Sequence, residues 1–195
     1  MTPTEILEDE HRVIERVLDC LEEGAGRLDG GETVSTDFFL EAAEFVAGFA
    51  DRCHHAKEED ILFAAMTARD MPQDTGPVAV MLQEHEQGRR YTAGFRNAAE
   101  QMKSGDAGAA NDIVRNVFNY VNLLREHINK EDHVLYPMAR QIIPDNAMQE
   151  VAAEFRRIVS DDERSGRSAR YRALADRLAE YVRTLGGDRP QELSA

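Results

Sequence analysis

Two segments of the chain place a histidine and a glutamate four residues apart, His55-Ala-Lys-Glu-Glu59 and His127-Ile-Asn-Lys-Glu131. Residues with this spacing share one face of an α-helix, so an imidazole and a carboxylate would project side by side. Imidazole and carboxylate together suit iron, manganese, zinc or copper. Each pair therefore predicts part of a metal site.

A second register is open for the first pair. His54 and Glu58 are also four residues apart, and on an α-helix His54 lies about 100° around the axis from His55. The face that carries His54 and Glu58 is less apolar. We therefore expect His55 and Glu59 to face the core, with His54 and Glu58 as the alternative.

His11 and His85 are two further candidate ligands, because all four histidines lie on apolar stripes with helical period. The apolar residues on these stripes are Leu7, Ile14, Leu18 and Leu21 around His11; Phe45, Phe49, Leu62 and Met66 around His55; Val78, Met81, Leu82 and Phe95 around His85; and Ile113, Val117, Leu124 and Leu135 around His127. Burial of a charged or hydrogen-bonding group costs on the order of several kcal/mol unless it is compensated. Metal ions would provide this compensation. The predicted metal ligands are His11, His55, Glu59, His85, His127 and Glu131.

The spacing along the chain predicts that these residues meet. Side chains on neighbouring antiparallel helices lie together when they are equally far from the connecting turn. The midpoints between successive histidines are Thr33, Asp70 and Asp106, and each lies in or beside a segment marked by Gly or Pro. The expected fold is all-α, an up-down-up-down four-helix bundle with one or two additional C-terminal helices and the metal site inside the bundle.

The ordered series His11, His55-x-x-x-Glu59, His85 and His127-x-x-x-Glu131 resembles the hemerythrin-like, or HHE cation-binding, family. The resemblance covers roughly residues 4 to 140. It implies a four-helix bundle that holds two non-haem iron ions bridged by carboxylates. Carried over to this sequence, it implies that Glu59 and Glu131 bridge the irons. His11 and His55 would bind one iron, and His85 and His127 the other.

One position departs from the pattern of the oxygen-carrying members, which have a fifth histidine one turn after the third. Here that residue is Arg89, whose guanidinium stays protonated and cannot bind a metal. We expect Arg89 to turn toward solvent or to pair with a carboxylate, such as Glu86 or one on a neighbouring helix. The vacated coordination position argues against reversible oxygen carriage and favours a reactive site.

Composition excludes several classes of function. The 195-residue chain has 37 acidic and 23 basic residues and a net charge of −14, so we expect no nucleic-acid partner. No apolar run reaches about 18 residues, and Met1-Thr2-Pro3-Thr4 lacks the regions of a signal peptide. We therefore expect no membrane association and a cytoplasmic location, which the unpaired spacing of Cys20 and Cys53 also favours.

We expect three parts along the chain. Residues 1–143 form the bundle with the two irons. Residues 144–185 form a helical extension without candidate ligands, which packs on the bundle or on a partner chain, as in a homodimer formed through these helices. Residues 186–195 form a disordered tail.

The expected function is that of a di-iron protein that binds or reduces dioxygen, peroxide or nitric oxide. As an enzyme it would decompose peroxide or reduce nitric oxide. The alternative is a protein that senses or buffers iron or oxygen without catalysis, and a third class is a bundle that its metal only stabilises. Ligand type alone does not choose the metal. Two shared carboxylates favour a metal pair, and the resemblance favours iron.

Overall fold

The computed structural model describes residues 1–187, and every regular element in this part of the chain is helical. The prediction of an all-α fold is therefore confirmed. In chain order the elements are α1 (Pro3–Asp29), α2 (Thr36–Phe45), η1 (Val46–His55), η2 (Glu58–Leu62), α3 (Phe63–Thr67), α4 (Gly76–Lys103), η3 (Ala107–Ala109), α5 (Ala110–Lys130), η4 (Glu131–Leu135), α6 (Tyr136–Ile142), α7 (Asp145–Ser165) and α8 (Arg167–Gly187). None of the described helices is long and apolar enough to cross a membrane.

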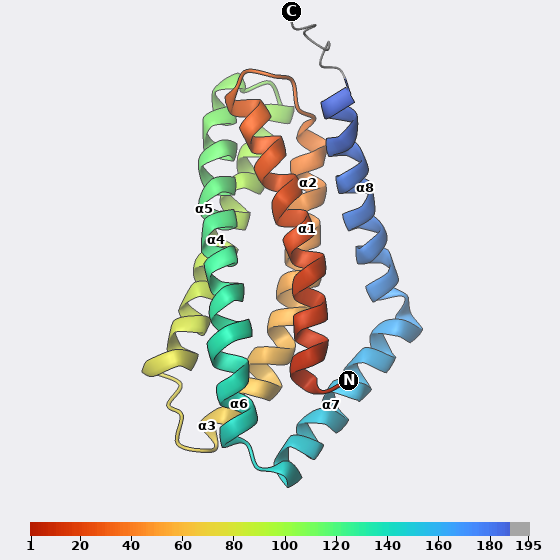
Figure 1. Ribbon diagram of the computed structural model, residues 1–195. Coiled ribbons are helices and arrows are strands. Elements are labelled where there is room, and N and C mark those ends of the chain that lie inside the picture. Colours follow the sequence, from red (N-terminus) through yellow and green to blue (C-terminus); the bar gives the residue numbers. More distant parts are fainter. Residues whose placement is uncertain (188–195) are drawn as a thin grey trace, which may run out of the picture.

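The long helices lie side by side and enclose the core (Figure 1). α5 packs against α1 and α4, and α2 packs against α4 and α8. The three midpoints predicted from the histidine spacing, Thr33, Asp70 and Asp106, all lie in connections between helices. The spacing rule therefore identified the turns, and it places the histidines at a common level of the bundle.

The apolar core is divided into two clusters by the polar residues of that level. On α1, Leu7 belongs to one cluster and Val13 to the other, and His11 lies between them. On α4, Met81 and Phe95 flank His85 in the same way. The histidines thus form a buried polar layer with apolar side chains on both sides.

The segment between α2 and α3 is π-helical over η1 and η2, which changes the predicted face. A π-helix bonds residue i to i+5 and takes more residues per turn than an α-helix. The inward row accordingly advances in steps of four or five residues, and its buried members are Phe45, Phe49, His54, Glu58, Leu62 and Met66. The prediction that Glu59 faces the core is corrected here, since Glu58 takes that position.

The predicted C-terminal extension consists of α7 and α8. α8 lies along α1 and α2, and α7 crosses the end of the bundle near the N-terminus (Figure 1). Residues 186 and 187 of the predicted tail are the last residues of α8, and residues 188–195 lie outside the described part of the chain.

Close contact between α8 and η1 depends on a glycine. A Cβ atom added to Gly48 would lie 1.9 Å from the hydroxyl oxygen of Tyr171. The centroid of the Tyr171 ring lies 6.4 Å from the ring centroids of both Phe45 and Phe49. The absence of a side chain at Gly48 therefore allows α8 to seat its tyrosine on the bundle.

We expect Gly48→Ala to destabilise the protein by about 2 kcal/mol, because overpacking of a filled contact typically costs that much. Thermal unfolding followed by circular dichroism measures the change. Gly26→Ala is the matched control, since no atom lies within 4 Å of a Cβ at that position. Equal melting temperatures for Gly48→Ala and the parent would contradict the docking of α8 on η1.

Candidate metal centre

Two groups of buried side chains lie at the polar layer, and the ligand atoms within each group lie within 4.8 Å of one another. The first, which we call the three-histidine group, contains His55, Glu58, His85 and His127. The second, the two-histidine group, contains His11, His54, Glu58 and Glu131. Glu58 belongs to both groups, so the two sets form one continuous site.

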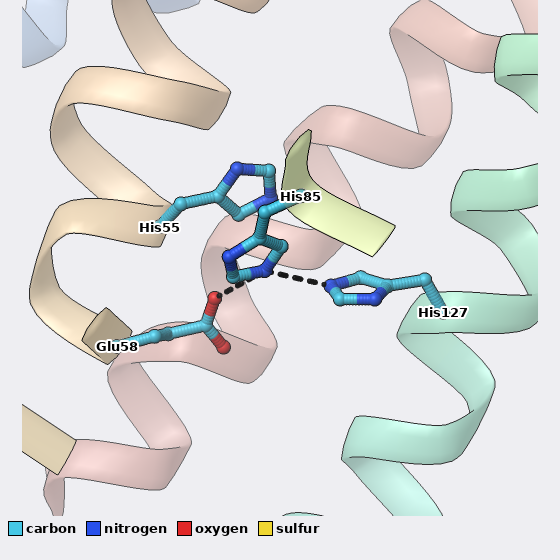
Figure 2. Close-up of side chains that lie close together, drawn as sticks. All are labelled: His55, Glu58, His85 and His127. Atoms are coloured by element: carbon cyan, nitrogen blue, oxygen red, sulfur yellow. Dashed lines mark hydrogen bonds and ion pairs between the residues drawn. The ribbon is translucent and has the colours of Figure 1, made fainter. Parts of the chain in front are cut away.

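The three-histidine group combines side chains from three parts of the bundle (Figure 2). His55 and Glu58 come from η1 and η2, His85 comes from α4 and His127 from α5. Nε2 of His85 lies 3.0 Å from Nε2 of His127 and 3.5 Å from Oε2 of Glu58. The His55 and His85 rings stack with their centroids 3.8 Å apart. These side chains converge from different helices on one small volume.

The two-histidine group is built around Glu131. Its Oε2 lies 3.2 Å from Nε2 of His11, and its Oε1 lies 3.2 Å from Nε2 of His127 in the other group. The His11 and His54 ring centroids are 4.6 Å apart. Glu131 therefore faces both groups, as Glu58 does.

The structure brings together five of the six predicted ligands and adds two others. His11, His55, His85, His127 and Glu131 lie in the groups, and His54 and Glu58 join them. The expected association of His11 with His55 is not observed, because His55 lies with His85 and His127, and His54 lies with His11.

Glu59 lies outside both groups. Its side chain is 27% exposed, and its Oε1 accepts hydrogen bonds from Nδ1 of His85 at 2.7 Å and from Arg89 at 2.5 Å. The hydrogen bond from His85 and the Arg89 charge outweigh the effect of burial and lower the pKa of Glu59 to about 2. Glu59 thus orients His85 by accepting a hydrogen bond from its Nδ1.

Each of the five histidines has a carboxylate behind it. The Nδ1 contacts are His11 with Asp132 (2.7 Å), His54 with Glu10 (3.0 Å), His55 with Asp51 (3.1 Å), His85 with Glu59 (2.7 Å) and His127 with Glu84 (2.9 Å). A carboxylate that accepts from Nδ1–H fixes the tautomer and leaves the Nε2 lone pair available, which is the usual outer support of a metal-bound histidine. All five imidazoles are therefore oriented to present Nε2 to the interior.

Three of the four carboxylate oxygens of Glu58 and Glu131 have no hydrogen-bond partner among the described residues. Oε2 of Glu58 and both carboxylate oxygens of Glu131 are fully buried without a hydrogen-bond partner among the described residues. Buried polar atoms are normally hydrogen-bonded, and unpaired buried charges cost several kcal/mol. Carboxylate oxygens and Nε2 atoms that face one another are the donor set that cations satisfy.

In the metal-free protein, the protonation states of the buried histidines and carboxylates limit the repulsion among them. Burial and the charge of Glu131 raise the pKa of Glu58 well above its usual range. Burial lowers the pKa of His127, but Glu131 and Glu84 outweigh it and raise the value to about 9. In His55, burial and the charge of His127 lower the pKa to about 3. The metal-free site therefore carries a proton on His127 at neutral pH and a neutral His55.

Metal binding should release that proton. Because His127 binds metal only without its Nε2 proton, at least one proton per chain should leave at neutral pH, and the apparent affinity should rise with pH up to about 9. Titration calorimetry in two buffers of different ionisation enthalpy counts the protons released. An affinity independent of pH, with no proton released, would contradict the assignment of His127 as a ligand.

An internal repeat relates the two groups. The segment Lys57-Glu58-Glu59-Asp60-Ile61-Leu62-Phe63 corresponds to Lys130-Glu131-Asp132-His133-Val134-Leu135-Tyr136, and His54 and His127 stand at the same distance before them. Glu10-His11 likewise corresponds to Glu84-His85. This repeat identifies His54 with Glu58 as the counterpart of His127 with Glu131. It is the signal in the sequence that the spacing argument missed.

The contacts obey the same relation. Glu10 accepts from Lys57 and lies against His54, and Glu84 accepts from Lys130 and lies against His127. Asp132 supports His11 as Glu59 supports His85. The site is therefore an approximately two-fold arrangement of ligands and of the residues that support them.

Two pairs of positions break this relation. His55 follows His54, whereas Ile128 follows His127, so only one group gains a third imidazole. Phe63 stacks on His85 with ring centroids 6.0 Å apart, and its counterpart Tyr136 stacks on His11 at 5.6 Å. The two groups thus differ by one imidazole and by one hydroxyl.

Arg89 pairs with carboxylates, the second of the two outcomes expected from the sequence. Besides its hydrogen bond to Glu59, its guanidinium lies 3.7 Å from Glu86 and 3.8 Å from Asp51. Arg89 therefore pairs with Asp51 and Glu59, the carboxylates that support His55 and His85. Position 89 therefore supplies no imidazole. His54, from a different helix, supplies the fifth one instead.

Comparison with known proteins identifies the family. The model of the hemerythrin HHE cation-binding domain matches residues 2–139, and the chain belongs to this family. Proteins of Mycobacterium tuberculosis, strains H37Rv and CDC 1551, and of Mycobacterium bovis are 23% identical to it over 186 residues. The alignment covers 95% of this chain and 71% of each relative, and all three are described as uncharacterized. No solved structure matches the chain.

Proposed function

We propose that the chain binds two non-haem iron ions in an up-down-up-down bundle, one at each histidine group, with Glu58 and Glu131 shared between them. The observation that carries this proposal is the orientation of the five imidazoles. Each is supported at Nδ1 by a carboxylate. Nε2 of His11, His54, His85 and His127 faces a buried oxygen of Glu58 or Glu131, and His55 lies in the same group as His85 and His127. Outer carboxylates of this kind orient metal-binding histidines and strengthen them as ligands.

We further propose that the bound pair reacts with a small oxidant: dioxygen, peroxide or nitric oxide. A ferrous pair supplies two electrons for reduction of such a molecule. The protein contributes a dry surrounding, because apolar clusters that include Leu7 and Met81 on one side and Val13 and Phe95 on the other flank the layer. A site enclosed in this way admits small ligands and excludes bulky ones.

A second candidate is a protein that senses or buffers iron or oxygen without catalysis. The supply of a fifth imidazole by His54 favours it, because the open coordination position expected from Arg89 was the sequence argument for reactivity. Five imidazoles and two shared carboxylates fill more of the coordination positions than four imidazoles do. The two candidates therefore differ in whether one chain converts many molecules of the oxidant.

Anaerobic stopped-flow spectroscopy on the iron-loaded protein tests the reaction. We expect rapid spectral changes on mixing with hydrogen peroxide or nitric oxide, and consumption of many equivalents of one of them per chain when a reductant is present. A single equivalent consumed, followed by no further reaction, would support the sensing or buffering function. The absence of any spectral change with either molecule or with dioxygen would contradict both.

A further inference from the structure

A tyrosine outside the predicted ligand set contacts two members of the two-histidine group. Tyr136 is fully buried, and its hydroxyl donates to Oε1 of Glu58 at 2.5 Å. The same hydroxyl lies 3.3 Å from Nε2 of His11, over whose ring the tyrosine stacks. Tyr136 thus contacts a residue of each kind, a shared carboxylate and an imidazole.

The two shared carboxylates differ because of this hydroxyl. Glu131 accepts no hydrogen bond from a hydroxyl of the described residues, and each of its oxygens faces an imidazole of a different group, Oε2 toward His11 and Oε1 toward His127. The residue that corresponds to Tyr136 in the repeat is Phe63, which has no hydroxyl. In Glu58, Oε1 is engaged by Tyr136, and only Oε2 remains without a partner.

The free oxygen of Glu58 faces both groups at once. Oε2 lies 3.6 Å from Nε2 of His54 and 3.5 Å from Nε2 of His85. The hydrogen bond from Tyr136 therefore holds the carboxylate in a rotation that directs one oxygen between the two groups.

We propose that Tyr136 is a positioning residue that makes the two shared carboxylates bind the metal pair in different modes. Glu131 presents one oxygen to each group, whereas Glu58 presents Oε2 to both and keeps Oε1 on the Tyr136 hydroxyl. This inference rests on the proposed metal pair. It assigns to Tyr136 the role of orienting Glu58, and it places a hydroxyl beside the group that has fewer imidazoles.

The test compares Tyr136→Phe with the parent chain, both loaded anaerobically with ferrous iron-57. Tyr136→Phe removes one oxygen atom and keeps the ring that packs on His11. We expect the affinity for one of the two ions to fall roughly tenfold, the lower end of the effect of losing an outer partner of a ligand. We also expect the Mössbauer spectrum to change, because Glu58 is then free to use both oxygens.

Tyr120→Phe is the matched control. Tyr120 is also buried, and its hydroxyl has no hydrogen-bond partner among the described residues. Its removal should leave the iron affinity and the spectrum unchanged. Melting temperatures of the metal-free variants separate a local change at the ligand from a general loss of stability, since a structural effect would lower the melting temperature without altering the spectrum.

Two results would overturn the proposal. An affinity and a Mössbauer spectrum that Tyr136→Phe leaves unchanged would mean that the tyrosine only packs against His11. A tyrosinate-to-iron absorption band in the oxidised parent, lost in Tyr136→Phe, would mean that Tyr136 binds the metal itself. Failure of the parent chain to retain iron would instead contradict the proposed function, and the two failures are thereby distinguished.

Discussion

Replacement of Glu58 by alanine should abolish binding of the metal pair, whereas replacement of Glu59 by alanine should leave two ions bound at saturating iron. Glu58 is fully buried and shared by both histidine groups, so its loss removes a ligand from each. Glu59 acts only from behind His85, and loss of such a support typically weakens metal binding roughly 10-fold to 100-fold.

Iron analysis after loading and desalting measures the difference between the two variants. We expect less than about half an equivalent in Glu58→Ala, because loss of a direct, shared ligand exceeds the range for outer supports. Circular dichroism should show the same helix content in both variants and in the parent. If Glu58→Ala keeps two ions and Glu59→Ala loses them, the side chains follow the α-helical register expected from the sequence, and the π-helical register is wrong.

Removal of the metal should lower the melting temperature without unfolding the chain at room temperature. The two apolar clusters on either side of the polar layer are sufficient for a folded bundle. Binding at about 1,000 times the dissociation constant stabilises the native state by about 4 kcal/mol. In a chain of this size, that corresponds to a shift of roughly 10 °C.

Thermal unfolding with and without a chelator measures this shift, and Glu58→Ala, in which a chelator should have no effect, is the control. Loss of the helical circular dichroism signal on chelation at room temperature would contradict the account. It would favour the class in which the metal serves only to hold the fold.

The sequence predicted most of the bundle because the relevant helices are regular. α5 is α-helical through Lys130, and π-helical pairing begins only at Glu131. The four-residue spacing therefore places His127 and Glu131 on the same face of the helix, as predicted. The same holds for His11 on α1 and His85 on α4, each inside one long α-helix. For these residues an apolar stripe with helical period was a sufficient guide.

The first pair failed for a local reason. η1 is π-helical over Val46–His55, the turns that lead into the pair, and the added residue per turn brings Glu58 to the interior in place of Glu59. A search for apolar residues with a period of 3.6 does not detect the backbone hydrogen bonds that define a π-helix. The placement of both His54 and His55 at the site could not be read from that pattern either. Comparison of Lys57-Glu58 with Lys130-Glu131 would have given the correct register.

The number of metal ions bound per chain is the decisive test of the proposed iron pair. The full chain, freed of metal, is loaded anaerobically with ferrous iron, separated from unbound ions and analysed for iron, manganese, copper and zinc together with protein concentration. Two shared carboxylates and two histidine groups predict two iron ions per chain. One iron per chain, or zinc as the only metal retained, would contradict the account.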